Sequence, residues 1–139
     1  MITRYLAVAL RDAGLVWHPV EGDRFQLDLP NDVEFESEAD VFTVSAMTIE
    51  ARQTPSGTDL AFNGTTEWAL DAVTLADAVW LPREDQLREL LRGIFRSLER
   101  LDDTFRVRVE ISGAELSFEH PDPAEAYGRA LLDLISRSH

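Results

Sequence analysis

The fold of this 139-residue chain is decided by one stretch near its C-terminus, FRVRVEISGAELSFEHPDPAEAYGRALLDLI (Phe105–Ile135). Its first part, Phe105–Ile111, alternates apolar and charged residues, which is typical of a strand with one buried face. Ser112-Gly113 is a turn signal, and the alternation then resumes. We therefore predict a hairpin that pairs Phe105–Ile111 with Glu115–Glu119.

The same stretch then changes to a helical period. Asp122 is a suitable N-cap, Pro123 suits the first helical position, and Glu125 stands at capping-box spacing. The predicted helix has an apolar stripe formed by Tyr127, Ala130, Leu131, Leu134 and Ile135.

Two further helices follow from apolar spacing. The first covers Ile2–Ala13 and ends at Gly14, a residue that favours the left-handed conformation of a helix C-terminus. The second begins near Pro82 and extends to Leu101. Its predicted apolar face consists of Leu87, Leu90, Leu91, Ile94, Phe95, Leu98 and Leu101.

Strand patterns occupy much of the remaining sequence. We predict a hairpin that joins Val41–Arg52 to Thr58–Phe62 across a Pro-Ser-Gly turn, and an earlier strand at Asp23–Leu29. The stretch Glu67–Leu81 stays ambiguous, with a short helix near Leu75–Ala78 as one reading.

The order of these elements decides the fold class. A helix, several strands, a helix, a hairpin and a helix follow one another without βαβ alternation, so we predict an α+β fold. Its antiparallel sheet would carry about three helices packed on it. The length suits a single domain over residues 1–139.

The composition excludes several kinds of chemistry. The chain has no cysteine and no lysine, since all 13 of its basic residues are arginines. Thiol chemistry, cysteine-based metal sites, Schiff-base catalysis and a P-loop are therefore excluded. No other cofactor loop or metal motif is present, so we expect no cofactor, no metal and no catalytic residue. With 26 acids, the net charge of −13 argues against binding to nucleic acid or anionic membranes.

The N-terminal residues briefly resemble a signal peptide. Met1–Leu10 is largely apolar, but Arg11 and Asp12 end the run early and no small-residue cleavage site follows. No run of 18 apolar residues occurs anywhere in the chain. We therefore expect a cytoplasmic protein with no membrane segment.

Acids recur at every second position in one segment, which we call the acidic strip. In an extended strand its five carboxylates would share one face. A calcium loop of the EF-hand type is not matched, because Ser37 and Thr43 stand where that loop needs glycine and glutamate. The strip is either a solvated edge that discourages strand pairing or a contact for a basic protein partner. It consists of Asp32, Glu34, Glu36, Glu38 and Asp40.

A second candidate site surrounds the tryptophans. A turn at Asn63-Gly64 and several polar side chains lie beside Trp68, and aromatic pockets with a few placed polar groups are typical ligand sites. Glu67 or Asp71 would act there as an acid or base. The structural alternative is a core position for each indole. The candidate pocket residues are Trp17, Asn63, Thr66, Glu67, Trp68, Asp71, Trp80 and Arg83.

Two segments carry a resemblance to known proteins. FNGTTEWALD (Phe62–Asp71) and WLPREDQLRELL (Trp80–Leu91), together with Met1–Trp17 and Ala124–Leu132, resemble small actinobacterial proteins often labelled pilus assembly protein CpaE. The label implies at most a non-catalytic association with pilus machinery. The ATPase of longer CpaE proteins needs a P-loop lysine, which this chain lacks.

Three hypotheses about function follow. The absence of catalytic signatures favours a non-enzymatic binding protein that contacts a basic partner through the acidic strip. The alternative is a small-molecule-binding domain or enzyme with a pocket around Trp68 and Trp80. A third hypothesis is a homodimer formed through the apolar face of Leu87–Leu101.

Overall fold

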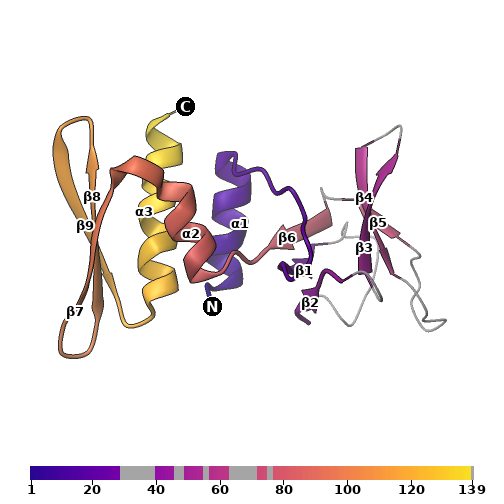
Figure 1. Ribbon diagram of the computed structural model, residues 1–139, viewed down its shortest axis with the longest axis horizontal. Coiled ribbons are helices and arrows are strands. Elements are labelled where there is room, and N and C mark those ends of the chain that lie inside the picture. The colour runs from indigo at the N-terminus through magenta and orange to yellow at the C-terminus, as the bar shows by residue number, and fades with distance from the viewer. Residues whose placement is uncertain (29–39, 46–48, 55–56, 63–71, 75–76, 139) are drawn as a thin grey trace. The chain divides into compact units, whose positions relative to one another are not determined.

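A computed structural model describes residues 1–28, 40–45, 49–54, 57–62, 72–74 and 77–138 (Figure 1). The chain divides into two compact units. Unit 1 comprises Met1–Leu15 and Pro82–His139, and unit 2 comprises Val16–Leu81. The organisation of residues 1–139 as a single domain stays a prediction.

Unit 1 contains the three helices of the described residues. In α1 (Arg4–Ala13), the Thr3 hydroxyl accepts a hydrogen bond from the Leu6 N–H at 3.2 Å, and Gly14 ends the helix with a φ of 118°. In α3 (Pro123–Arg137), the Asp122 carboxylate accepts from the Ala124 N–H at 2.9 Å. The predicted end of α1 at Gly14 and the predicted N-cap of α3 at Asp122 are therefore confirmed. The predicted capping box at Glu125 does not form, because the Asp122 N–H donates to Nδ1 of His120 instead.

The sheet of unit 1 is antiparallel, in the order β7-β8-β9. Its strands are β7 (Phe95–Arg100), β8 (Phe105–Ile111) and β9 (Ala114–His120). Between β8 and β9, Ser112 and Gly113 both have positive φ, 52° and 82°, as a tight hairpin turn requires. The predicted C-terminal hairpin is confirmed, with β8 and β9 paired from Phe105–His120 to Ile111–Ala114.

Helix α3 lies at the centre of unit 1 (Figure 1), where it packs against α1, α2 (Glu84–Leu91) and the sheet. Helices α1 and α3 pack closely at Gly128, where a Cβ atom would lie 2.5 Å from Cδ2 of Leu6. A glycine at this position therefore lets the two helices approach closely. The α3 residues from Ala124 to Ala126 are also buried, including Glu125, whose Oε2 has no hydrogen-bond partner among the described residues.

The predicted second helix is wrong beyond Leu91. Helix α2 ends there, a 3₁₀ turn (η3) spans Arg92–Ile94, and the chain continues as β7. Arg92 has a φ of 52° and is followed by Gly93, so the helix cannot continue through these two residues. The continuous helical face of Leu87–Leu101 therefore does not exist, although self-association itself stays a prediction.

A β-bulge explains why the apolar spacing resembled a helix. The pairing of β7 with β8 shifts register between Phe95 and Ser97. Phe95 and Leu98 are then opposite Val109 and Val107, so both belong to the face of the sheet that packs on α3. One extra residue in the strand thus gives two apolar residues an i, i+3 spacing without a helix.

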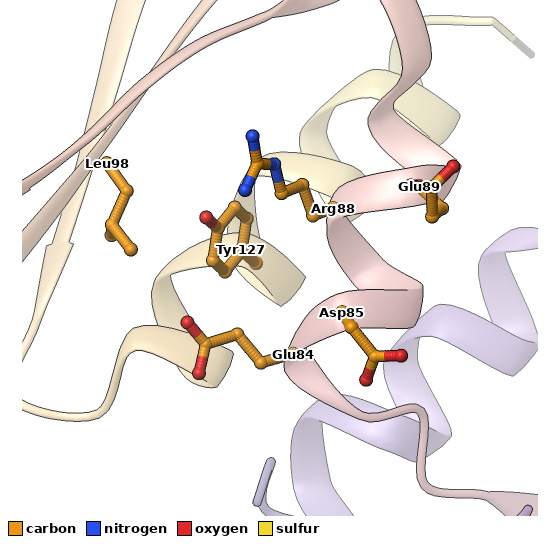
Figure 2. Close-up of a pocket in the computed structure, with 6 residues that line it drawn as sticks. All are labelled: Glu84, Asp85, Arg88, Glu89, Leu98 and Tyr127. Carbon is orange, nitrogen blue, oxygen red and sulfur yellow. The ribbon is translucent and has the colours of Figure 1, made fainter.

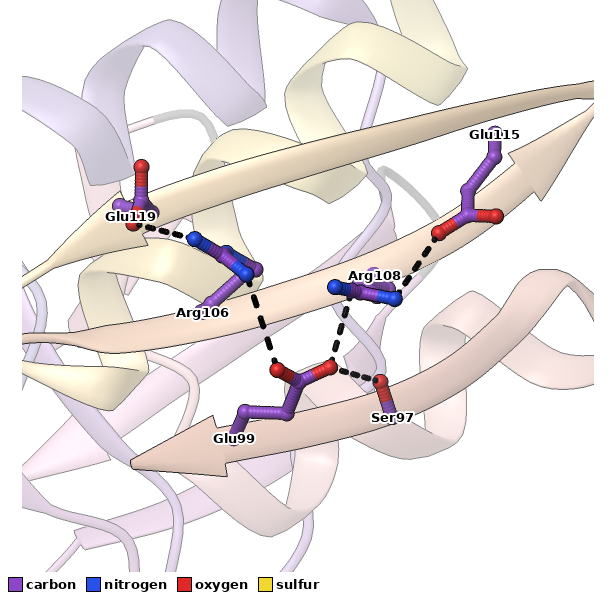
Figure 3. Close-up of polar contacts among 6 residues, drawn as sticks. All are labelled: Ser97, Glu99, Arg106, Arg108, Glu115 and Glu119. Carbon is purple, nitrogen blue, oxygen red and sulfur yellow. Dashed lines mark hydrogen bonds and ion pairs between the residues drawn. The ribbon is translucent and has the colours of Figure 1, made fainter. Parts of the chain in front are cut away.

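The outer face of this sheet carries a charge network (Figure 3). Glu99 on β7 forms ion pairs with Arg106 at 3.7 Å and with Arg108 at 2.9 Å, both on β8. The same arginines reach Glu119 at 3.2 Å and Glu115 at 3.4 Å on β9. Each arginine is therefore shared between neighbouring strands, which indicates that the network stabilises the strand pairing.

Replacing Glu99 with glutamine should lower the stability of unit 1 by about 0.5–1 kcal/mol, because both arginines lose their contact with β7. The loss should shrink in about 1 M salt, where exposed charges are screened. Urea unfolding followed by circular dichroism measures it. Glu110→Gln removes the single exposed pair with Arg96 and should cost less. Equal costs at low salt would show that the shared network adds nothing.

Unit 2 contains two small antiparallel sheets among its described residues. One has the order β2-β1-β6, and the other has the order β3-β4-β5. Their bounds are β1 (Arg24–Leu27), β2 (Phe42–Thr43), β3 (Ile49–Thr54), β4 (Gly57–Phe62), β5 (Ala72–Thr74) and β6 (Ala78–Trp80).

The outcome for the strand predictions of unit 2 is mixed. The predicted strand at Asp23–Leu29 is observed as β1 over Arg24–Leu27. The second half of the predicted hairpin strand Val41–Arg52 is observed in β3, which pairs with β4, but its first half is wrong, because Phe42–Thr43 forms the separate strand β2 and pairs with β1. The ambiguous stretch contains strands β5 and β6, and β6 begins at Ala78. Asp77 has a 3₁₀ conformation, while Leu75 and Ala76 lie outside the described residues, so the short helix near Leu75–Ala78 stays a prediction. The predicted α+β class is confirmed. None of the described helices is long and apolar enough to cross a membrane.

Candidate functional site

Most of the acidic strip lies outside the described residues. This applies to Asp32, Glu34, Glu36 and Glu38. Asp40 is described, and it is exposed in a bend that precedes β2. The face shared by the five carboxylates therefore stays a prediction.

Two residues of the predicted tryptophan pocket come together in unit 2. The rings of Trp17 and Trp80 stack with centroids 6.2 Å apart and planes 8° from parallel, and Phe25 lies 5.4 Å from Trp17. The indole N–H of Trp17 donates to the buried carboxylate of Asp23 at 3.0 Å. The buried Trp80 Nε1 has no hydrogen-bond partner among the described residues. Trp17 and Phe25 form part of the core of unit 2, and the half-buried ring of Trp80 stacks on Trp17.

The other residues of that predicted pocket are not brought to these indoles by any described contact. Asn63, Thr66, Glu67, Trp68 and Asp71 lie outside the described residues. Arg83 belongs to unit 1, where it stands at the N-cap of α2. Its backbone N–H donates to the Gln86 side chain at 2.9 Å, and its guanidinium contacts Asp85 at 3.2 Å. Both contacts give Arg83 a role in starting the helix.

The described histidines have no arrangement typical of catalysis. Nδ1 of His120 accepts a hydrogen bond from the Asp122 N–H at 2.9 Å, which joins the end of β9 to the start of α3. His18 is exposed. No group of three or more potential metal ligands occurs within the described part of the chain.

The charge of the protein is divided unequally between its units. Unit 2 holds 13 of the 26 acids but only 2 of the 13 arginines, which gives it a formal net charge of −11. Unit 1 holds the other 13 acids together with 11 arginines, which gives it a formal net charge of −2. A cationic partner would therefore be attracted mainly to unit 2.

Unit 1 contains a pocket of about 490 Å³ that the sequence patterns did not reveal (Figure 2). On the face of the sheet that packs on α3, part of β7 is not covered by this helix. Leu98 is therefore partly exposed there and forms one wall of the pocket. Helix α2 provides most of the polar lining. The lining residues are Glu84, Asp85, Arg88, Glu89, Leu98 and Tyr127.

Tyr127 is the most enclosed residue of this pocket. Its side chain is 1% exposed, and its ring packs against Phe95 with centroids 5.7 Å apart. None of the hydrogen bonds among the described residues involves its hydroxyl. Burial raises the pKa of Tyr127 above its usual value of 10.0; nearby Arg88 partly opposes this rise and Glu84 adds to it. The phenol therefore remains protonated and able to donate at neutral pH.

Arg88 and Glu84 lie on either side of this phenol (Figure 2). The Arg88 guanidinium stacks on the Phe95 ring at 4.8 Å from the centroid. Neither Arg88 nor Glu84 takes part in an ion pair among the described residues. By contrast, Glu99 on the outer face of the sheet forms ion pairs with both Arg106 and Arg108. The pocket therefore has a cation, an anion and a phenol hydroxyl available to a ligand.

Raising the pH above about 10 should destabilise unit 1 through Tyr127. Its folded pKa is raised, so its contribution to stability is complete below the unfolded pKa of about 10 and is lost as the pH rises through the folded pKa. Tyr127→Phe should reduce this alkaline loss, whereas replacing the exposed Tyr5 with phenylalanine should leave it in place. Urea unfolding between pH 8 and pH 11, followed by circular dichroism, would measure the effect. An unchanged loss in Tyr127→Phe would contradict it.

The comparisons with known proteins add no relative to this description. No protein-family model, curated protein or solved structure matches the chain. The likeness to proteins labelled pilus assembly protein CpaE therefore stays a resemblance. The sequence missed the unit 1 pocket because Tyr127 belonged to the apolar stripe of one helix and Arg88 to the polar side of another. No sequence signal placed these residues together.

Proposed function

We propose that this protein is a non-enzymatic cytoplasmic binding protein whose unit 2 contacts a basic protein partner. The observation that carries the proposal is the unequal division of charge, −11 on unit 2 against −2 on unit 1. A surface field of one sign raises the rate at which an oppositely charged partner is encountered and favours it over other partners. The acidic strip supplies five of the 13 acids in unit 2.

The contrast between the units supports a role beyond solubility. In unit 1 the arginines nearly balance the acids. Many of these arginines and acids form ion pairs with one another, as on the outer face of the sheet. Unit 2 has only Arg24 and Arg52 to balance its acids. Its unbalanced charges cost stability through repulsion, and a basic partner would relieve that cost. The resemblance to CpaE-labelled proteins makes pilus machinery one source of such a partner.

Charge reversal in the acidic strip tests the proposal. The purified protein is used to capture a basic partner from a lysate of cells that produce this protein. The double variant Glu36→Arg/Glu38→Arg should lower the recovery of that partner at least about tenfold. Quantitative mass spectrometry measures the recovery at two salt concentrations, because an electrostatic contact weakens as salt increases.

The matched control changes the same net charge elsewhere. Asp102→Arg/Asp103→Arg also changes the net charge by +4, at two exposed residues of unit 1. It should leave recovery of the partner within about twofold of the unchanged protein. Equal losses in both double variants would show that only total charge matters. Unchanged recovery in Glu36→Arg/Glu38→Arg would contradict the role of the strip.

A further inference from the structure

The pocket of unit 1 lined by α2, Leu98 and Tyr127, which we call the α2 pocket, has no part in the proposed contact of unit 2. It joins two exposed side chains of opposite charge and the phenol hydroxyl of Tyr127, and none of the three has a hydrogen bond or ion pair within the described residues. Glu84 and Arg88 stand four positions apart on α2, with the acid N-terminal, an arrangement that usually forms an ion pair. Here the two groups point to opposite sides of the Tyr127 ring (Figure 2).

Arg88 is held away from Glu84 by its packing. The guanidinium carbon lies 4.8 Å from the centroid of the Phe95 ring, a cation–π contact that favours this position over a pair with Glu84. Phe95 is itself packed against Tyr127, so one aromatic ring contacts both the cation and the phenol. Arg88 and Glu84 are both exposed, so a ligand can reach them from solvent.

The chemistry of these groups identifies the class of ligand. A guanidinium and a phenol O–H together donate to a carboxylate, whereas the Glu84 carboxylate accepts from an ammonium group. Leu98 provides an apolar wall, and the volume of about 490 Å³ is within the usual range for a small-molecule site. Glu84, Asp85 and Glu89 also outnumber the single arginine, so an anion without an ammonium group would be repelled.

We propose that the α2 pocket binds a small apolar amino acid as its zwitterion. The carboxylate contacts Arg88 and the Tyr127 hydroxyl, the ammonium group contacts Glu84, and the apolar side chain lies against Leu98. This assignment requires that both charged groups of the ligand contribute to binding.

A ligand panel on the unchanged protein tests this requirement without any variant. L-leucine, leucinamide and N-acetyl-leucine share one side chain, but leucinamide lacks the carboxylate and N-acetyl-leucine lacks the ammonium group. Nuclear magnetic resonance titration should show saturable binding of L-leucine, with both analogues at least about tenfold weaker. Binding of leucinamide as tight as that of L-leucine would overturn the proposal, because the pocket would then be a simple cation site. Absence of leucine binding up to about 10 mM would also overturn it.

Variants then assign the contacts. Arg88→Gln should weaken L-leucine binding at least about tenfold and leave leucinamide binding unchanged, since leucinamide has no carboxylate to lose. Tyr127→Phe should weaken L-leucine binding about threefold to tenfold, because it removes one donor and keeps the packing. Arg129→Gln changes an exposed arginine of α3 and should have no effect. Equal weakening by Arg88→Gln and Arg129→Gln would contradict the assigned site.

Discussion

Replacing Phe25 with alanine should lower the stability of unit 2 by about 3–5 kcal/mol, the usual cost of removing a fully buried phenyl ring. Phe25 is 0% exposed on β1, and its ring lies 5.4 Å from Trp17 and 5.6 Å from Phe42. The substitution therefore leaves a cavity beside the stacked indoles. Few small units keep a folded state after a loss of this size.

The distribution of chromophores allows the loss to be assigned to unit 2. All three tryptophans lie within Val16–Leu81, whereas the described helices all belong to unit 1. Denaturation followed by tryptophan fluorescence should show a much lower midpoint for Phe25→Ala. The helical signal of circular dichroism should change less. Val41→Ala removes an exposed apolar side chain of the same unit and should cost under about 0.5 kcal/mol. A fluorescence midpoint equal to that of Val41→Ala would contradict this description of the core.

Replacing Gly128 with valine should destabilise unit 1 by about 2–3 kcal/mol, the upper part of the usual range for overpacking. A Cβ at this position lies 2.5 Å from Cδ2 of Leu6 and 3.6 Å from Cγ2 of Ile2. Both of those side chains are buried, so they have little room to move, and valine adds two further methyl groups. Leu6 would have to leave its present rotamer, or helices α1 and α3 would have to separate.

Circular dichroism measures this effect, since both helices contribute to its signal. Arg129→Val places the same residue at the next position of α3, which is exposed, and it controls for the lower helix propensity of valine. That control should cost only a few tenths of a kcal/mol. A loss in Gly128→Val no larger than the loss in Arg129→Val would show that α1 and α3 do not pack closely at Gly128.

The elements that the sequence predicted correctly are those with local signals. The C-terminal hairpin has strict alternation and a turn whose residues, Ser112 and Gly113, accept positive φ. Helix α3 begins where Asp122 and Pro123 indicate it should, and α1 ends at Gly14. In each case the residues that fix the element are neighbours in sequence, so the pattern contains the information.

The sequence-based prediction is wrong where pairing between strands, rather than the local sequence, decides the secondary structure. The segment Phe95–Arg100 has the apolar spacing of a helix, but its bulge and its pairing with β8 produce the same spacing in a strand. The local signal against a continuous helix was Gly93, and a single glycine is often tolerated within helices. Contacts with a strand that follows later in the chain therefore outweighed the local period.

The candidate site shows the same division. The charge excess of the segment that forms unit 2 can be counted directly from the sequence, and the acidic strip can be seen in it. The α2 pocket cannot, because it needs α2, α3 and the bulged β7 to bring Arg88, Tyr127 and Leu98 together. Trp17 and Trp80 stack on each other, with Trp17 buried in the core of unit 2 and Trp80 half-buried, and the pocket around Trp68 and Trp80 stays a prediction.

The central claim is that a cationic partner binds unit 2, and chemical-shift mapping tests it most directly. Titrating the ¹⁵N-labelled protein with an arginine-rich peptide at physiological salt should move resonances of Val16–Leu81, with the largest changes in Asp32–Asp40. The resonances of unit 1 should change little, because arginines balance most of its acids. Shifts concentrated in Pro82–His139, or spread evenly over both units, would contradict the account.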